Sequence, residues 1–219
     1  KGYQALKIAL ASDVVAPLQD IHEDITETDT VLEIAEKIFS TNGKTIESTR
    51  QILEGASLEK TVEQFLKARR IEFFGSGGSA VVALDAYHKF VRSGLQVSAI
   101  LESHMQLMSA SQLTTADVAV VISHSGASKE TLDIAKLLKE KGVPMIAITN
   151  YAKSPLSKIA DVSLYTVSQE TAFRSEALAS RIAELSLIDA LFTAVMMRRG
   201  EAARTSLQQM REAISMRRI

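Results

Sequence analysis

The sequence predicts an α/β fold built on a doubly wound, five-stranded parallel sheet flanked by helices. Five short apolar segments alternate along the chain with segments whose apolar residues recur at helical spacing. One of the short segments, Val118–Ile122, is apolar at every position. Strands of this kind are typical of a parallel sheet, because helices cover both of its faces and bury the strands.

The alternation begins near residue 71. We expect strands at residues 71–74, 96–100, 118–122, 145–149 and 162–165. We expect helices at residues 80–91, 105–111, 129–141, 156–159, 173–199 and 202–216. In doubly wound sheets the ligand binds beyond the carboxyl ends of the strands, so the loops that follow the strands are the first place to look for a site.

The segment before the first strand is predicted to contain a short helix, a linker and two connector helices. Residues 1–12 have apolar positions at helical spacing, and because the chain begins inside this helix, we expect it to be the end of a preceding domain. Residues 13–30 are acidic and rich in Asp and Thr, which is typical of a linker. The connector helices are expected at residues 31–53, with Asn42-Gly43 as a candidate break, and at residues 58–68.

The composition allows one substantial core and excludes several function classes. With 219 residues, of which 46% are hydrophobic, the chain can bury a large apolar interior. The absence of cysteine excludes disulfides, zinc ribbons and thiol catalysis and fits the reducing cytoplasm, where we expect the protein. The four histidines lack ligand spacing, so we expect no metal site. The apolar tract at residues 187–197 contains Asp189 and is too short to cross a bilayer, so we expect no membrane partner.

The charge balance bears on DNA binding. The formal net charge is −1, whereas a self-sufficient DNA-binding domain normally carries an excess of basic residues. The arginines near the C-terminus are expected to form a solvated face of the last helices. By its charge, this chain is therefore not expected to be a DNA-binding domain on its own.

Two loops of small polar residues follow predicted strands and open predicted helices. The first is Gly75-Ser76-Gly77-Gly78-Ser79-Ala80, and the second is Ser123-His124-Ser125-Gly126-Ala127-Ser128. The first N–H groups of a helix have no partner within the helix, and the helix dipole favours an anion there. Serine hydroxyls add donors without charge or bulk. Two such loops on one sheet predict a phosphorylated small molecule held between them.

Each loop also has a simpler interpretation. Residues 75–80 satisfy the loose G-x-G-x-x-[GA] dinucleotide pattern, in which Glu102 would contact a ribose, but this leaves the second loop unexplained. A tight turn that needs glycine for a positive φ is another alternative. In the second loop, we expect one of the three serines to cap the following helix. Three hydroxyls within six residues exceed what a cap needs, so anion binding is favoured.

Three further polar residues stand near the predicted ligand edge. His104 follows the second strand, where a helix-capping or surface role and a ligand contact both remain open. Glu176 and Arg181 lie on the helix predicted at residues 173–199, where their spacing alone favours a solvated face.

The two loops resemble those of the sugar isomerase (SIS) domain. That family pairs a Gly/Ser loop after the first strand with an S-x-S-G-x-[ST] loop after a later strand, as GSGGS at 75–79 and SHSGAS at 123–128 do here. The segment ITNYAKSPLSKIAD at 148–161 resembles the next strand of the family and its small-residue loop. The resemblance covers about residues 45–195 and implies the SIS fold with a phosphosugar site.

The chain also resembles the RpiR family of bacterial transcription regulators, in which a winged helix-turn-helix domain precedes an SIS domain that senses a sugar phosphate. The resemblance lies in GYQALKIALA at 2–11, in the acidic linker with two helices, and in FRSEALASRIAELSLIDALF at 173–192. It implies the end of the DNA-binding domain at residues 1–12, a linker at 13–30, and an SIS effector-binding domain at 31–219. DNA would be a partner through the preceding domain, and the chain would form a homodimer or a dimer of dimers.

The resemblance also implies a ligand-binding set. Ser79, Ser123, Ser125 and Ser128 would bind the phosphate, with Ser128 standing where many members have threonine. His104 would approach the sugar, and Glu176 would lie near the sugar of a neighbouring subunit. The full set implied is Ser76, Gly78, Ser79, His104, Ser123, His124, Ser125, Ser128 and Glu176. The expected effectors are amino-sugar phosphates such as N-acetylmuramic acid 6-phosphate or N-acetylglucosamine 6-phosphate.

A phosphosugar isomerase with the same fold is the competing interpretation. An aldose–ketose isomerase needs a base beside the reacting carbons, for which His104 and Glu176 are the candidates. An isomerase has no use for residues 1–12 and the linker, so we expect a ligand-sensing regulator without catalysis or cofactor.

Overall fold

A computed structural model describes residues 25–168 and 178–216 of the chain. Its centre is a five-stranded parallel sheet in the order β2-β1-β3-β4-β5. The strands are β1 (Ile71–Gly75), β2 (Val97–Ala99), β3 (Val118–Ile122), β4 (Met145–Thr149) and β5 (Val162–Tyr165). The sheet begins with β1, and β2 is added on one side of it. The chain then returns past β1 and adds β3, β4 and β5 in order on the other side. The predicted fold class is confirmed.

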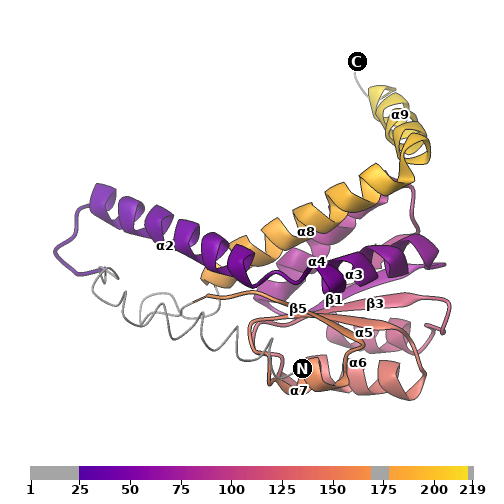
Figure 1. Ribbon diagram of the computed structural model, residues 1–219, viewed down its shortest axis with the longest axis horizontal. Helices are drawn as coiled ribbons and strands as arrows, with labels where there is room; N and C mark the ends of the chain where they lie inside the picture. The colour runs from indigo at the N-terminus through magenta and orange to yellow at the C-terminus, as the bar shows by residue number, and fades with distance from the viewer. Residues whose placement is uncertain (1–24, 169–177, 217–219) are drawn as a thin grey trace.

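Helices cover both faces of the sheet, as Figure 1 shows. One face carries α3 (Gly55–Lys67), α4 (Gly78–Phe90) and α8 (Leu178–Arg199), and the other carries α5 (Ser103–Ala110), α6 (Lys129–Glu140) and α7 (Pro155–Ile159). Successive residues of the inner strands pack on opposite faces of the sheet. Val120, for example, belongs to the core under α3, α4 and α8, and Val121 to the core under α5, α6 and α7. Both cores exclude water from the strands, which is why β1, β3 and β4 are buried at every residue.

The core on the α3/α4/α8 side is built around four phenylalanines. Phe90 of α4 meets Phe65 of α3 edge-on at 5.3 Å between ring centroids, and it meets Phe192 of α8 at 5.6 Å. Phe73 of β1 lies 5.6 Å from Phe90. Phe73 also meets Phe65 edge-on at 6.3 Å. Aromatic pairs of this kind add to the stabilisation from buried area, so this cluster ties three helices to β1.

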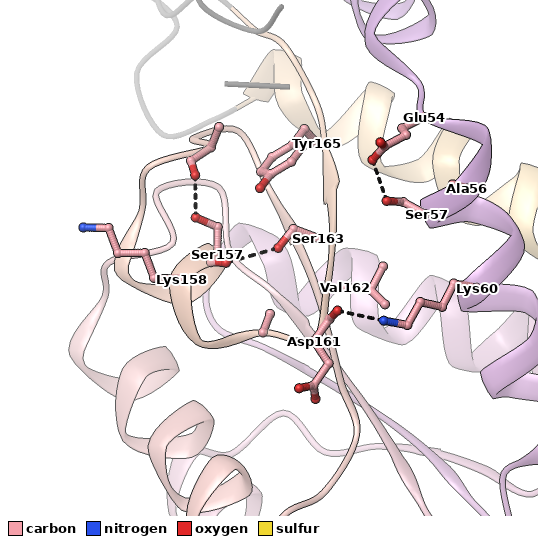
Figure 2. A pocket seen from close by; sticks show the side chains of 12 residues that line it. Glu54, Ala56, Ser57, Lys60, Ser157, Lys158, Asp161, Val162, Ser163 and Tyr165 are labelled. Carbon is pink, nitrogen blue, oxygen red and sulfur yellow. Dashed lines mark hydrogen bonds between the residues drawn. The ribbon is translucent and has the colours of Figure 1, made fainter. Parts of the chain in front are cut away.

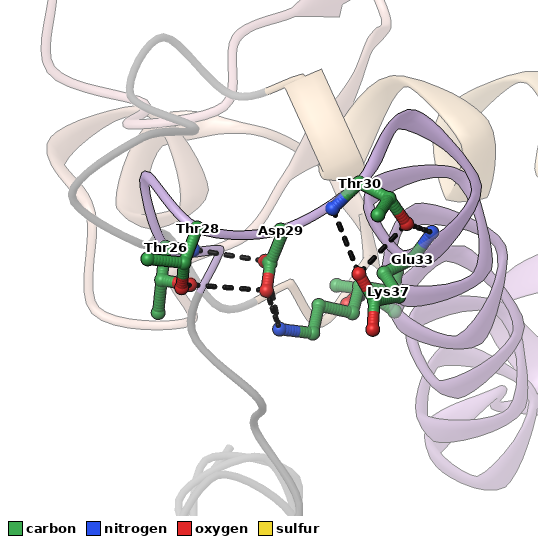
Figure 3. A network of polar contacts seen from close by, with 7 residues as sticks. Thr26, Thr28, Asp29, Thr30, Glu33 and Lys37 are labelled. Atoms are coloured by element: carbon green, nitrogen blue, oxygen red, sulfur yellow. Dashed lines mark hydrogen bonds and ion pairs between the residues drawn. The ribbon is translucent and has the colours of Figure 1, made fainter.

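The helix α2 (Val31–Ile52) projects from the body of the molecule and packs by its C-terminal half (Figure 1). Thr30 and Glu33 form a capping box, in which each side chain bonds the other residue's backbone N–H. Asp29 accepts hydrogen bonds from Thr26 and from the Lys37 ammonium group, and Figure 3 shows how these contacts fix the turn that leads into the helix. The helix continues through Asn42-Gly43, so the candidate break is wrong.

The helices α4 and α8 run in parallel on one face. Lys89 of α4 pairs with Asp189 of α8 at 2.6 Å, and Phe90 contacts Phe192. The 3₁₀ turn η2 (Val91–Ser93) that follows α4 contacts α8, and it also contacts α9 (Glu201–Ser215), which follows α8. The C-terminal ends of α4 and α8 therefore lie together, and their N-terminal ends lie together at the carboxyl edge of the sheet.

Most predicted elements are confirmed within one to three residues. Three of the five strands have the predicted bounds, whereas β2 is shorter than expected at Val97–Ala99 and β1 extends to Gly75. The helix α3 begins three residues early, at Gly55. The expectations for residues 1–24, which include the remnant helix and most of the linker, and for 173–177 lie outside the described residues. In the described part of the chain, no helix combines the length and apolarity that a membrane crossing requires.

Candidate functional site

The two predicted loops lie next to each other at the carboxyl edge of the sheet. They follow β1 and β3, which are neighbouring strands, and Gly75 at the end of β1 pairs in register with Ile122 at the end of β3. The connection from β1 leads to one face of the sheet and that from β3 to the other, so the chain changes direction at this point. A crevice at such a switch point is where doubly wound sheets bind ligands.

The first loop brings the N-terminus of α4 close to β1. A Cβ atom at Gly75 would lie 2.5 Å from the carbonyl oxygen of Ser79, so only glycine allows this approach. Gly77 has φ +55 and ψ −124, a conformation that favours glycine, and no side chain caps the helix. The hydroxyls of Ser76 and Ser79 form no hydrogen bond with any residue that the structure describes. Among the first N–H groups of α4, those of Ser79 and Ala80 donate to the Ser76 and Gly77 carbonyls at 3.1 Å, whereas that of Gly78 has no acceptor among the described residues. The Gly78 N–H and the two serine hydroxyls are therefore available to an anion.

The second loop holds its backbone with its own serines. The Gly126 N–H donates to the Ser123 carbonyl and hydroxyl oxygens at 3.1 and 3.2 Å, and the Ala127 N–H donates to the Ser125 hydroxyl at 3.3 Å. In each case the hydroxyl acts as the acceptor, so its proton is left for another partner. Ser123 is buried, whereas Ser125 is exposed.

The N-terminus of α6 is not capped by a side chain. Ser128 occupies the N-cap position, but its hydroxyl donates to the Thr131 hydroxyl at 2.7 Å instead of accepting from a backbone N–H. The expectation that one of the three serines caps this helix is therefore wrong. Because the Ser128 hydroxyl bonds Thr131, the first N–H groups of α6 remain available to bind an anion.

The segment after β4 supports the second loop from one side. Gly126 has φ +60, and a Cβ atom there would collide with the Ser154 hydroxyl. The Leu156 N–H donates to the Gly126 carbonyl at 3.0 Å, and the Thr149 hydroxyl donates to the His124 carbonyl, also at 3.0 Å. These contacts explain the small residues at 148–161, since a larger side chain would push the loop away from β4 and α7.

The two histidines of the predicted set lie on different loops. The half-buried ring of His124 meets Tyr151 edge-on, with 5.6 Å between ring centroids. His104 is exposed on the first turn of α5, just beyond the end of β2. Because β2 neighbours β1, His104 lies at the same edge of the sheet as the first loop.

Glu102 serves as the cap of α5. Its carboxylate accepts hydrogen bonds from the backbone N–H groups of His104 and Met105 at 3.0 and 2.8 Å. These bonds, led by the one from His104, lower the pKa of the Glu102 carboxyl group. A carboxylate committed to a helix start is poorly placed to bind a ribose, so the structure lends no support to the dinucleotide alternative.

Gln106 is a structural residue of the site that the sequence did not indicate. It is buried on α5, and its amide nitrogen donates to the carbonyl oxygens of Gly75 and Ile100 at 2.8 and 2.7 Å. It thereby ties the ends of β1 and β2 together. A lone glutamine on a short helix carries no sequence signal for this role.

The remaining predicted residue, Glu176, lies outside the described residues. Arg181 is half-buried on the first turn of α8. No group of three or more His, Cys, Asp or Glu side chains suited to a metal ion occurs in the part of the chain that the structure describes.

A groove of about 430 Å³ lies elsewhere, along the outer edge of β5 (Figure 2). Its walls come from α3, α7 and β5, and the Lys60 ammonium group donates to the Asp161 carbonyl across it at 3.2 Å. None of the predicted site residues lines this groove, which separates it from the loops after β1 and β3.

Comparisons with known proteins agree with this architecture. The family model described as "SIS domain" matches residues 64–194. An uncharacterized HTH-type transcriptional regulator of Caldanaerobacter subterraneus is 39% identical over 219 residues, which cover 100% of this chain and 78% of the relative. The HTH-type transcriptional regulator HexR of Pseudomonas aeruginosa is 35% identical over 213 residues, which cover 97% of this chain and 74% of the relative.

Among solved structures, the NanR protein of Vibrio vulnificus complexed with ManNAc-6P superposes with a TM-score of 0.78. It is 25% identical, and the match covers 94% of this chain and 73% of NanR.

The chain thus belongs to the SIS-domain family. Within that family its relatives are HTH-type transcriptional regulators, as the resemblance to the RpiR family implied. The names of these relatives also confirm the interpretation of the chain as part of a regulator rather than as an isomerase.

Proposed function

We propose that this chain is the effector-sensing part of a bacterial transcription regulator, and that a sugar phosphate bound between the loops after β1 and β3 alters DNA binding by a preceding domain. The observation that carries the proposal is the pairing of two helix N-termini without side-chain caps, α4 and α6, at the ends of two neighbouring strands. The Gly78 N–H of α4, the first N–H groups of α6 and the serine hydroxyls supply donors on both sides of one crevice.

We assign the phosphate to the serines. Ser79 brings its hydroxyl from the start of α4, and the second loop brings Ser123, Ser125 and Ser128. Ser76 and Gly78 stand beside the phosphate. The sugar would extend toward His124 and His104, and Glu176 would approach it from a neighbouring subunit.

The ligand class follows from the site and from one neighbour. The predicted residues bring no metal cluster and few charges to the loops, so neutral donors and helix dipoles would balance the phosphate charge. The NanR structure holds ManNAc-6P, the 6-phosphate of an acetylated amino sugar. An amino-sugar 6-phosphate is therefore the effector class we propose.

The proposal assigns three regions to the chain. Residues 1–12 would end a winged helix-turn-helix domain, residues 13–30 would link it to the sensor, and residues 31–219 would form the SIS domain with its connector and C-terminal helices. Such a regulator acts on DNA, so we place it in the cytoplasm.

We also propose that the domain forms a homodimer or a dimer of dimers. Two helices that flank the three-residue edge strand β2 expose apolar side chains to solvent. We call this the α4–α5 surface, and its exposed residues are Val81, Leu84, Tyr87, Val91, Leu101, Met105, Leu107 and Met108. Contiguous apolar surface of this kind marks an interaction site in soluble proteins.

The coupling between ligand and DNA then needs only a modest free energy. A change of about a hundredfold in operator affinity corresponds to a coupling of about 2.7 kcal/mol. A few charge-assisted hydrogen bonds to the phosphate, made in only one arrangement of the two subunits, can supply this. The linker and α2 would carry the change to the DNA-binding domains.

The test is operator binding by the full-length regulator, measured by fluorescence anisotropy with and without saturating sugar 6-phosphate. We expect the ligand to change the operator affinity, and the Ser123→Ala variant to lose this response. Equal operator affinity in the presence and absence of every sugar phosphate that the protein binds would refute the proposal.

A further inference from the structure

One glutamate in the core forms no hydrogen bond with the described residues that would explain why it is buried. Glu184 on α8 is 1% exposed, and its Oε1 accepts no hydrogen bond from the residues that the structure describes. Burial raises the pKa of its carboxyl group to about 7, and the charge of Arg181 offsets this only in part. An unpartnered buried carboxyl group is costly, so its presence calls for a function.

The packing of α8 on α4 places this residue near the first loop. Lys89 of α4 pairs with Asp189 of α8, and the two helices run in the same direction. Five residues before this pair, Glu184 of α8 therefore lies at the same height as Leu84 of α4. Eight residues before the contact between Phe90 and Phe192, Glu184 lies at the same height as Val82. Glu184 therefore lies about one helical turn below Ser79 at the start of α4.

The position of Glu184 on α8 indicates the direction of its side chain. Glu184 shares one stripe of α8 with Ile188, Leu191 and Val195, which belong to the core against the sheet. Side chains on a helix lean toward its N-terminus, and the N-terminus of α8 lies at the carboxyl edge of the sheet. From this geometry we infer that the carboxyl group lies on the side of Glu184 that faces the carboxyl edge of the sheet, where the two loops are.

His124 lies at the same edge of the sheet, in the bend that follows β3, where its half-buried ring packs edge-on against Tyr151.

We propose that Glu184 is a specificity-determining residue of this site, whose carboxyl group hydrogen-bonds a hydroxyl or amino group of the bound sugar. The inference rests on the proposed function and extends it from the phosphate to the sugar. It predicts a ligand with a hydrogen-bond donor at the end remote from the phosphate. Amino-sugar phosphates meet this requirement, whereas inorganic phosphate does not use Glu184 at all.

The test compares two probes, glucosamine 6-phosphate and inorganic phosphate, by isothermal titration calorimetry on the 219-residue chain. Glu184→Met keeps the length of the side chain but removes the hydrogen-bonding group. We expect it to lower the affinity for glucosamine 6-phosphate by about tenfold or more and to leave that for inorganic phosphate unchanged. Glu184→Gln keeps an acceptor oxygen and should recover part of the affinity.

Glu72→Met is the matched control. Glu72 is also fully buried with an unpartnered Oε1, but it lies near the opposite end of β1, where Ser98 donates to its Oε2 at 3.1 Å. We expect this variant to keep both affinities. Circular dichroism checks that each variant is folded before its affinity is measured.

The outcomes separate this inference from the proposed function. Unchanged affinity of Glu184→Met for glucosamine 6-phosphate would overturn the role of Glu184 while leaving the phosphate site intact. A parallel loss for inorganic phosphate, or unfolding of both Glu184 variants, would make the residue structural and overturn the inference as well. If wild-type protein bound neither probe, the proposed function itself would fail.

Discussion

At the scale of single residues, the serines of the two loops differ in how far the protein itself uses their hydroxyl groups. Ser79 forms no side-chain hydrogen bond with the described residues, and the Ser123 hydroxyl accepts from Gly126 while its own proton has no acceptor among them. Ser128, in contrast, donates its proton to the Thr131 hydroxyl. The hydroxyl protons of Ser79 and Ser123 are therefore the ones that we expect a ligand to use.

Substitution of these serines tests that division. Ser79→Ala and Ser123→Ala should each weaken sugar-phosphate binding by roughly 1.5–3 kcal/mol, the contribution of a hydrogen bond to a charged group. The free energy of unfolding should change little for Ser79→Ala. Titration calorimetry and urea unfolding of the same preparations measure both quantities. Unfolding with unchanged affinity would instead make the serines structural.

Glu184 gives a residue-scale prediction about pH. Its pKa is raised from 4.5 to about 7 in the folded protein, mainly by burial. Below about pH 4.5 the carboxyl group is neutral in both states and contributes nothing. As the pH rises further, the unfolded state releases the proton first, so the folded state loses stability until the pH passes the folded pKa. The loss amounts to about 3 kcal/mol above that point.

Glu184→Gln should remove this pH dependence, because an amide does not ionise. We expect the variant to be more stable than wild type at about pH 8 and to approach wild type at about pH 4.5. Urea unfolding at the two pH values measures the difference. A variant that is less stable than wild type at the higher pH would contradict the environment described for Glu184.

At the scale of elements, the second loop depends on the segment that leads into α7. Gly126 lies against Ser154 and Thr149, and its carbonyl oxygen accepts a hydrogen bond from the Leu156 N–H. The site is thus built from three strand ends, β1, β3 and β4, rather than from two loops alone. Contacts of this kind keep the loop in place without a ligand.

Gly126→Ala tests this support. The added Cβ atom would collide with the Ser154 side chain, and φ +60 is strained for alanine. We expect a loss of stability of about 1–3 kcal/mol together with weaker phosphate binding, because the loop must move. Gly43→Ala is the control, since nothing lies within 4 Å of a Cβ atom there. Equal affinity of Gly126→Ala and wild type would show that the loop tolerates the shift.

Hydrophobic patterning was sufficient to predict most elements of this fold. The strands at 118–122, 145–149 and 162–165 were found with their observed bounds because they are short, apolar and bounded by polar turns. Asn42-Gly43 did not break α2, since packing and the capping box at Thr30 outweigh the low helix propensity of two residues. The start of α5 was missed because it depends on the carboxylate of Glu102 as a cap.

The site was predictable only in its loops. Small polar residues between strand and helix identified both loops that we propose to bind the phosphate, whereas Gln106 and Glu184 gave no signal. Their roles arise from contacts between segments far apart in the sequence, such as the bond from Gln106 to Gly75. The missing side-chain cap of α6 has a local cause instead, because the Ser128 hydroxyl bonds the Thr131 hydroxyl three residues further on.

At the scale of the whole molecule, the features proposed for regulation lie at separate places. The crevice is at the carboxyl edge of the sheet, the α4–α5 surface flanks β2, and α2 projects from the body of the molecule (Figure 1). The helix α4 takes part in two of these, because its first turn carries Ser79 and its outer face belongs to the α4–α5 surface. A ligand at its N-terminus can therefore influence how two copies pack.

The oligomeric state tests this arrangement. Leu84→Asp would place a charge in the centre of the proposed interface, where burying it costs several kcal/mol. We expect wild type to sediment as a dimer or larger assembly in analytical ultracentrifugation, and Leu84→Asp as a monomer. Met197→Asp, at an exposed position on α8 outside this surface, should behave as wild type. A monomeric wild type, or a dimeric Leu84→Asp variant, would contradict the proposed interface.

The binding of a sugar phosphate between the two loops is the central claim, and ligand-observed proton NMR tests it most directly. The 219-residue chain would be mixed with a panel of sugar 6-phosphates, amino sugars included, and followed over several hours beside the Ser79→Ala/Ser123→Ala double variant. We predict selective broadening of at least one amino-sugar phosphate by wild type, none by the variant, and no new product signals. Absence of binding by wild type, or equal broadening by the double variant, would contradict the two-loop site.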